Sequence, residues 1–321
     1  MARVLITGGA GFVGSRVARK FVERGDEVFV FDTFKQYLLP DPTAEQPNLL
    51  IRLKDFIDSI ELIQGDTLEK DHLRRTLTKV EPDIVVHMAA LPLAFMAIEH
   101  SEDAFRSILG STVNFLEIIR DMARPCRLVY TSSSMVYGDF AGDSVTEDAD
   151  TDPKEIYGSF KLSGEVVCRG YMKCYDLDVT IVRPSAVYGP YDANQRVLQK
   201  FIGRALRGEP LKVDGDGSMR LDFTYVDDAA QAIFLAATHA KARGETFNVT
   251  RGRSRSLKEA IDIIQEKLPD LSVEYVPKPS YIPKRGTLDI TKARTLLGFE
   301  PKYDLEQGIP EYIEHLRTHP I

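Results

Sequence analysis

The sequence is poor in the residues that build disulfide frameworks and metal sites. It holds only three cysteines, Cys126, Cys168 and Cys174, and their spacing matches neither a disulfide scaffold nor a metal-binding motif. The six histidines are scattered without a pair at ligand spacing, so no metal site is expected. We interpret the cysteines as small core residues of a protein in a reducing compartment, which predicts a cytoplasmic location.

Long apolar runs and an excess of positive charge are also missing. No apolar stretch approaches the roughly 20 residues that a membrane-spanning helix needs, so no membrane segment is expected. The N-terminal stretch MARVLITGGAG lacks the basic region, long apolar core and cleavage site of a signal peptide. A formal net charge of −7 is unfavourable for a nucleic acid or an anionic membrane as partner. The 321 residues suffice for one large or two modest globular domains.

Apolar runs of strand length alternate with amphipathic helical segments over the first part of the chain. Continuous apolar strands that alternate with helices indicate a parallel sheet covered on both faces. The predicted fold class is therefore α/β, a Rossmann doubly wound parallel sheet followed by a smaller C-terminal substrate domain. Strands are expected over 3–9, 27–32, 60–66, 83–90, 127–134 and 178–189, and helices over 14–25, 72–80, 102–122 and 157–175.

The pattern changes after Gly189. A basic amphipathic helix is expected over 194–208, turn residues interrupt the strand-like runs beyond it, and prolines become frequent toward the C-terminus. We predict a nucleotide-binding domain over 1–182 and a substrate domain over 183–321, with some segments of the second crossing back to the first. The connection over 33–60 has little pattern and fits either a binding loop or a surface insertion.

The stretch VLITGGAGFVG places three glycines after a predicted strand and at the start of a predicted helix. In a dinucleotide-binding turn, Gly8 permits the tight turn, Gly11 lets the backbone approach a pyrophosphate, and Gly14 allows close helix–strand packing. Asp32 closes the second strand, where a carboxylate hydrogen-bonds the ribose hydroxyls of an adenosine and repels a 2′-phosphate. These residues predict NAD as the cofactor. Asp66, after the third strand, fits either a contact to the adenine amino group or a helix N-cap.

Tyr157 and Lys161 lie one turn apart on a predicted helix and therefore share a face. A lysine ammonium near a phenol favours the phenolate and lowers the pKa of the tyrosine, and the same lysine can hold a ribose hydroxyl of the cofactor. Such a pair alone is more often a packed tyrosine beside a solvated lysine. Its position after a dinucleotide turn and a serine-rich strand end makes it a catalytic candidate.

Taken in order, the motifs resemble those of the extended short-chain dehydrogenase/reductase family, in particular its NAD-dependent sugar-nucleotide epimerases and dehydratases, such as UDP-glucose 4-epimerase. They are TGGAGFVG, QGD, HMAA, TSSSMVYG, YGSFK, RPSAVYGP, GDG with DFTYVDDAAQAI, and DITKARTLLGFEPKYDLEQGI, and they span essentially the whole chain. The resemblance implies that Tyr157 is the general base and acid, that Lys161 orients the cofactor ribose, and that the substrate is a nucleotide sugar. It also implies a homodimer through a four-helix bundle of the 107–122 helix and the helix after Tyr157. The residues predicted to bind the cofactor are Gly8, Gly11, Phe12, Val13, Asp32, Asp66, Thr67, Met88, Ala89, Ala90, Thr131, Tyr157, Lys161 and Pro184.

Counting back from Tyr137 along TSSSMVYG separates the reactions of the family. By resemblance, Ser133 hydrogen-bonds the reacting sugar hydroxyl and completes the catalytic set with Tyr157 and Lys161. The next two positions are Ser134 and Met135 in this chain. Dehydratases of the family carry acidic residues at both positions, and decarboxylases carry one at the second. Because a methionine moves no proton, we expect 4-epimerisation through a transient 4-keto sugar. A net sugar dehydrogenase or reductase is the alternative, and a non-catalytic NAD-binding regulatory protein is a third hypothesis.

Departures from the family pattern leave the sugar and the nucleotide base open. Ala186 and Ser107 stand where the family has asparagine. Leu221 stands at the position where the family has an arginine that contacts phosphate, and Arg220 lies one residue earlier. In a strand, a shift of one residue turns the side chain to the other face, so Arg220 is an uncertain replacement.

Other cations remain available for an anionic substrate. Arg285 matches a late arginine that contacts the diphosphate in the family. Arg196 recurs with Lys200 and Arg204 at helical spacing, and this basic face points toward either the substrate or solvent. Candidate substrates are UDP-hexoses, UDP-hexuronates and related sugars. The residues predicted to bind the substrate are Ser133, Ser134, Arg196, Arg220 and Arg285.

Overall fold

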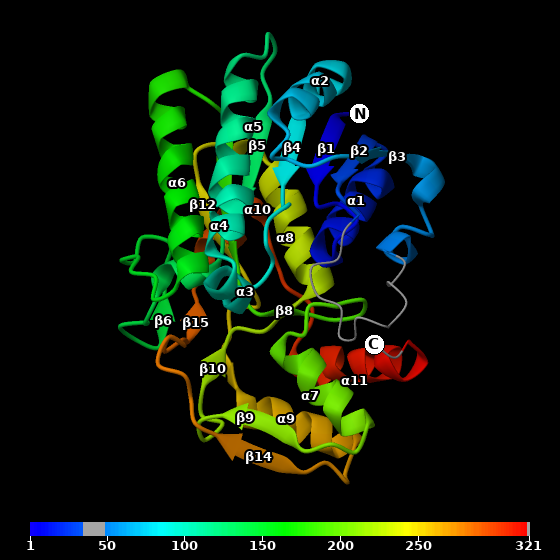
Figure 1. Ribbon diagram of the computed structural model, residues 1–321, viewed down its shortest axis with the longest axis vertical. Helices are drawn as coiled ribbons and strands as arrows, with labels where there is room; N and C mark the ends of the chain where they lie inside the picture. Colours follow the sequence, from blue (N-terminus) through cyan, green and yellow to red (C-terminus); the bar gives the residue numbers. More distant parts are fainter. Residues whose placement is uncertain (35–48, 320–321) are drawn as a thin grey trace.

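The computed structural model describes residues 1–34 and 49–319. At its centre lies a seven-stranded parallel sheet in the order β12-β7-β5-β4-β1-β2-β3, with helices on both faces (Figure 1). This doubly wound arrangement confirms the predicted fold class. The strands of the sheet are β1 (Arg3–Thr7), β2 (Glu27–Asp32), β3 (Ile60–Gln64), β4 (Ile84–His87), β5 (Arg127–Thr131), β7 (Val179–Pro184) and β12 (Thr246–Val249).

Side chains of the central strands alternate between two apolar cores. In β1, Val4 and Ile6 enter the core on one face of the sheet, while Leu5 enters the core on the opposite face. Because both faces are covered, the strand is a continuous apolar run in sequence. The helices of the first face are α1 (Phe12–Arg24), α8 (Val226–Thr238) and α10 (Thr291–Leu297), and those of the second are α2 (Lys70–Val80), α5 (Ser111–Arg120) and α6 (Ile156–Tyr175).

The strand order reverses between β1 and β4, which are hydrogen-bonded neighbours. The chain leaves these two strands toward opposite sides, and a crevice opens at their carboxyl ends. Gly8 follows β1 and Met88 follows β4, so both lie at this crevice. The topology thus places the predicted cofactor residues where doubly wound sheets bind their ligands.

The second half of the chain builds a smaller unit with its own apolar core, in the lower part of Figure 1. The structure nevertheless places α8, β12 and α10 against the sheet, so these segments cross back. The boundary at residue 182 stays a prediction. The elements of the smaller unit are β8 (Val187–Tyr188) paired with β11 (Thr224–Tyr225), α7 (Val197–Leu206), β9 (Leu211–Asp214) paired with β14 (Val273–Val276), β10 (Arg220–Leu221) paired with β13 (Arg255–Ser256), α9 (Leu257–Lys267) and α11 (Leu305–Thr318).

Apart from strands that end up to three residues early, two predicted elements differ from the observed ones. The strand expected over 178–189 ends at Pro184, because Ala186 adopts a left-handed conformation with φ of 39° and separates β7 from β8. The helix expected over 102–122 is divided by a π-helical turn, where helices often carry functional residues. The π-helical turn is η3 (Phe105–Gly110), and it follows α3 (Ala94–Glu99) and α4 (Ser101–Ala104). The remaining short elements lie elsewhere in the chain: η1 (Leu49–Arg52), η2 (Ile57–Ser59), η4 (Ser134–Tyr137), η5 (Ala240–Ala242) and the paired strands β6 (Ser144–Val145) and β15 (Thr287–Leu288).

Two of the sequence predictions concern thiols and the long connection. Cys126 and Cys168 are buried, as predicted, whereas Cys174 near the end of α6 is exposed, so the prediction of a core residue was wrong for it. The binding loop or insertion predicted over 33–60 lies partly outside the described residues. Among those described, no helix combines the length and the apolar character needed to cross a membrane. The cytoplasmic location stays a prediction.

Candidate active site

A cavity of about 480 Å³ lies at the crevice between the carboxyl ends of β1 and β4. Every residue predicted to bind the cofactor lines it, and so does Ser133. Of the other predicted substrate residues, Ser134, Arg196 and Arg285 line the cavity, whereas Arg220 does not. The structure therefore brings together residues that come from both halves of the chain.

The glycine turn has the close contacts that its sequence predicts. Gly8 has φ of 66°, and a Cβ atom at Gly14 would lie only 2.1 Å from the carbonyl oxygen of Gly8. The helix α1 begins at Phe12 after Gly11, with no side-chain cap and no acidic residue in its first turn. Its first backbone N–H groups are therefore available to an anion such as a pyrophosphate.

Two carboxylates that line the cavity, Asp32 and Asp66, are the candidates for contacts to the adenosine of the cofactor. Asp32 accepts hydrogen bonds from the backbone N–H of Ala10 at 3.0 Å and of Phe34 at 2.9 Å, and burial raises the pKa of its carboxyl group. Asp66 accepts a hydrogen bond from the backbone N–H of Leu68 at 2.9 Å. It is not the cap of α2, whose capping position is Glu69. Both carboxylates line the cavity, where a ribose and an adenine can contact them.

A buried histidine that the sequence reasoning missed fixes the cavity wall after β4. The Thr7 hydroxyl accepts hydrogen bonds from the backbone N–H groups of Met88 and Ala89, each at 3.1 Å. His87 lies 2.9 Å from the same hydroxyl and 3.2 Å from Ser111, and burial lowers its pKa to about 3. The imidazole is therefore neutral, and it holds the wall residues in place without adding charge to the site.

The catalytic candidates converge at one end of the cavity. The Ser133 hydroxyl accepts the backbone N–H of Met135 at 3.2 Å, and it acts to lower the pKa of the Tyr157 hydroxyl. The Lys161 ammonium donates to the carbonyl oxygen of Thr131 at 2.7 Å and lies 5.7 Å from the centre of the Tyr157 ring. Glu155 caps α6 and accepts the backbone N–H of Tyr157 at 2.7 Å, so it fixes the start of the helix that carries both residues.

The electrostatics of this pair differ from the sequence prediction. Burial raises the pKa of the Tyr157 hydroxyl to about 12, and Arg196 is the main positive charge that opposes this shift. Burial also lowers the pKa of the Lys161 ammonium to about 8, against the attraction of Glu165. Lys161 was expected to lower the pKa of this phenol; its ammonium is directed to the carbonyl oxygen of Thr131, and its role toward Tyr157 stays a prediction.

A buried ion pair supports the floor of the site. Arg183 donates to both carboxylate oxygens of Glu165, at 2.8 and 2.6 Å, and neither side chain is more than 3% exposed. Ser132 donates to the same carboxylate at 2.5 Å. Burial alone would raise the pKa of Glu165, but these contacts hold it below its usual range. Ser132, the first serine of the strand end, therefore anchors β5 to α6.

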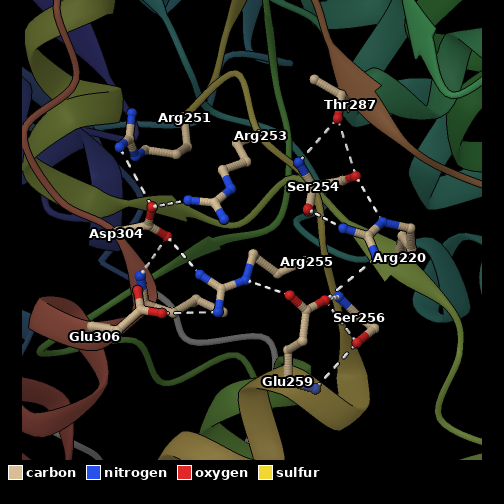
Figure 2. Close-up of polar contacts among 11 residues, drawn as sticks. Arg220, Arg251, Arg253, Ser254, Arg255, Ser256, Glu259, Thr287, Asp304 and Glu306 are labelled. Atoms are coloured by element: carbon tan, nitrogen blue, oxygen red, sulfur yellow. Dashed lines mark hydrogen bonds and ion pairs between the residues drawn. The ribbon is translucent and has the colours of Figure 1, made fainter.

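Arg220 was predicted to bind the substrate, and the structure places it elsewhere. It donates to the carbonyl oxygen of Ser254 at 2.6 Å and forms an ion pair with Glu259 at 3.4 Å (Figure 2). Because β10 pairs with β13, Leu221 takes the opposite face and lines the cavity. The apolar side chain of Leu221 therefore occupies the position in the cavity at which the family pattern has an arginine.

The basic face predicted from Arg196, Lys200 and Arg204 does not form. Arg196 immediately precedes α7 and lines the cavity. Lys200 is exposed with its ammonium 5.7 Å from the ring centre of Phe95, and Arg204 donates to the carbonyl oxygen of Pro210 at 2.6 Å. Only the first of these three cations faces the site.

Arg285 is the cation nearest the serines. Its guanidinium donates to the hydroxyl groups of Ser134 at 2.8 Å and Ser185 at 2.6 Å, and burial lowers its pKa to about 10. No carboxylate among the described residues forms an ion pair with it within 4.0 Å. Its charge is available to an anionic group of a ligand.

Comparisons with known proteins agree on a family. The model of the NAD dependent epimerase/dehydratase family matches residues 4–250. A UDP-glucose 4-epimerase from Mycolicibacterium smegmatis is 31% identical over 98% of this chain and 99% of its own length. A UDP-N-acetyl-alpha-D-glucosaminuronate decarboxylase from Bacillus cytotoxicus is 31% identical over 98% of each chain. The crystal structure of UDP-glucuronic acid 4-epimerase from Bacillus cereus, in complex with UDP-glucuronic acid and NAD, has a TM-score of 0.89 and 27% identity, and the match covers 98% of this chain and 99% of that one.

Proposed function

We propose that this chain, which belongs to the NAD dependent epimerase/dehydratase family, is a 4-epimerase of a nucleotide sugar. One observation carries the proposal. Ser133, Tyr157 and Lys161 share a cavity with the glycine turn, while Met135 occupies the position at which a second acid or base would act. The chain thus has the groups for oxidation and reduction and lacks an extra proton donor for elimination.

The cofactor is NAD. The family is NAD dependent, and the residues of the cavity fit this molecule. The uncapped start of α1 suits the pyrophosphate, and Asp32 disfavours a 2′-phosphate. Lys161 is placed to hold a ribose hydroxyl. When bound, NAD accepts a hydride and returns it.

The side chains of the site supply the proton chemistry. Tyr157, as phenolate, takes the proton of the sugar 4-hydroxyl and later returns it, while Ser133 holds that oxygen by a hydrogen bond. The 4-keto sugar turns over in the cavity between these two events, so that the other face of C4 receives the hydrogen. Met135 and Leu221 line the cavity without offering a group that removes water or carbon dioxide.

The substrate is proposed to be a UDP-hexose or UDP-hexuronate. Support comes from the two 4-epimerases described above, whose names give UDP-glucose and UDP-glucuronic acid. Arg196 and Arg285 supply two positive charges to a cavity whose carboxylates, Asp32 and Asp66, lie at the cofactor end. An anionic diphosphate or carboxylate would meet these cations.

Incubation with a panel of UDP-, dTDP-, GDP- and CDP-sugars tests the function. We expect epimer formation without accumulation of NADH, which absorbs at about 340 nm. Stoichiometric NADH release would identify a net dehydrogenase instead. Tight NAD binding without turnover of any sugar would favour a regulatory NAD-binding protein.

We also propose a homodimer, because apolar side chains are exposed on adjacent helices. Ile98 of α3, Phe105 of η3 and Val166 of α6 are 40%, 47% and 58% exposed, and α6 contacts both of the other elements. We expect sedimentation to give about twice the chain mass of 36.0 kDa. Phe105→Glu should produce monomers, because a carboxylate resists burial in an apolar interface. Tyr281→Glu, at an exposed tyrosine of the smaller unit, is the control and should leave the dimer intact.

A further inference from the structure

Arg52 connects three segments that are distant in the sequence. It is the last residue of η1, in the connection between β2 and β3. Its Nη1 atom donates to the carbonyl oxygen of Ala10 at 3.2 Å, and its Nε and Nη2 atoms donate to the carbonyl oxygen of Tyr191 at 3.1 and 2.9 Å. Every nitrogen of the guanidinium therefore donates to a backbone carbonyl group, and the planar side chain fixes the two carbonyl groups relative to each other.

The two carbonyl groups belong to different walls of the cofactor cavity. Ala10 lies in the glycine turn of the nucleotide-binding half, directly before Gly11, which lines the cavity. Tyr191 lies between β8 and α7 in the smaller unit, shortly before Ala193, which also lines the cavity. Arg52 lines the same cavity. Its guanidinium therefore links the turn that suits a pyrophosphate to the smaller unit.

The smaller unit holds the Tyr191 carbonyl group in place. Tyr191 has φ of 71°, a left-handed conformation that is uncommon for a residue with a side chain. The Nε2 atom of His315 in α11 accepts the Tyr191 backbone N–H at 3.1 Å, and the two ring centres are 4.4 Å apart. Burial lowers the pKa of His315 to about 4, so the imidazole is neutral and has a lone pair for this hydrogen bond. Contacts that do not involve Arg52 thus present this carbonyl group to it.

The three hydrogen bonds of Arg52 share a charged donor. Burial lowers the pKa of the guanidinium, but an arginine stays protonated near neutral pH. Hydrogen bonds from a charged group are stronger than those between neutral groups, and more so where water is largely excluded. Opening the crevice between the glycine turn and the smaller unit would break all three at once.

We propose that Arg52 is a positioning residue that holds the cofactor crevice closed, so that NADH stays bound between the two hydride transfers. Its hydrogen bonds join protein groups only, so a cofactor that passes between these walls has to break them on entry and on exit. The consequence for turnover rests on the proposed function. An epimerase returns the hydride to C4 of the sugar that lost it, whereas a dehydrogenase releases NADH after one transfer.

The test is the kinetics of cofactor binding to Arg52→Met, followed by NADH fluorescence in a stopped-flow instrument. The dissociation rate constant of NADH, measured by displacement with excess NAD, should rise by about tenfold or more, because hydrogen bonds with a charged donor are lost. The association rate constant should rise as well, since the same hydrogen bonds oppose entry. Arg52→Lys should give intermediate values, because one ammonium group does not reproduce the planar guanidinium.

Two further variants make the comparison specific. Arg19→Met is the matched control, because Arg19 of α1 pairs at 2.9 Å with Asp55 of the same connection and should leave both rate constants unchanged. His315→Phe removes the acceptor of the Tyr191 N–H and leaves Arg52 intact. It should raise both rate constants by a smaller factor, and it provides the test if circular dichroism shows that Arg52→Met does not fold.

The outcomes separate this role from others. Rate constants equal to those of the parent chain would overturn the proposal. Faster dissociation with unchanged association would make Arg52 a direct ligand of the cofactor, which also overturns it. With a sugar that the parent chain epimerises, Arg52→Met should release NADH, detected at about 340 nm. If the parent chain epimerises no sugar, the proposed function fails, while the binding kinetics still decide whether Arg52 holds the crevice closed.

Discussion

Tyr157→Phe should reduce epimerisation by about 10²–10⁴-fold or more, while NAD still binds. The substitution removes one oxygen atom and leaves the ring, which lies 5.7 Å from the Lys161 ammonium. Among the described residues at this end of the cavity, Ser133 and Met135 are not bases near neutral pH, and the Lys161 ammonium is directed to the carbonyl oxygen of Thr131. Product formation should be followed by chromatography, and NAD affinity by calorimetry.

Tyr171→Phe is the matched control for that substitution. Tyr171 lies on the same helix, α6, and its hydroxyl donates to Glu117 away from the cavity. It should leave turnover within about twofold of the parent chain, as is usual for a residue outside the site. Retention of full activity in Tyr157→Phe would remove Tyr157 from the mechanism.

Glu165→Gln should lower the free energy of unfolding by about 3–5 kcal/mol. The substitution leaves the Arg183 guanidinium buried without its counter-charge, and it weakens the hydrogen bond from Ser132. Urea unfolding followed by circular dichroism measures the loss. The midpoint should fall while the slope stays constant, since the surface exposed on unfolding is unchanged.

An exposed ion pair provides the comparison. Asp176 pairs with Arg243 at the surface, where their side chains are 94% and 52% exposed. Solvent screens such a pair, so Asp176→Asn should shift the unfolding midpoint very little. If the unfolding midpoint of Glu165→Gln differs from that of the parent chain as little as the midpoint of Asp176→Asn does, the Glu165–Arg183 pair contributes no more to stability than a surface ion pair.

Much of the cofactor end could be predicted because its signals are local. The tight turn at Gly8, the uncapped start of α1 and the carboxylate of Asp32 each depend on a few adjacent residues. Helical spacing likewise placed Tyr157 and Lys161 on one face. Strand patterns, glycines and i, i+4 spacings are readable from sequence because the geometry that they impose is local.

The remaining features depend on contacts between distant parts of the chain. The faces of Arg220 and Leu221 are set by pairing with β13, more than 30 residues later. The partner of Arg183 is Glu165 on α6, 18 residues earlier, and no local spacing in the sequence indicates that the two form a buried ion pair. Arg196 was predicted for its charge, but its ion pair with the buried carboxylate of Asp192, four residues earlier, was missed although the spacing is local.

The crossing of β12 and α8 into the central sheet has a consequence for synthesis of the chain. When the residues through β7 have been made, α1 still lacks α8, whose Phe234 ring packs 5.0 Å from that of Phe21. The edge of β7 is also unpaired until Thr246–Val249 emerge. The first half of a nascent chain therefore exposes an apolar helix face and a free strand edge while the ribosome adds more than 60 residues, which takes several seconds at about 5–20 residues per second. The nucleotide-binding half thus becomes a closed unit only late in translation, in the same interval in which the smaller unit begins to fold.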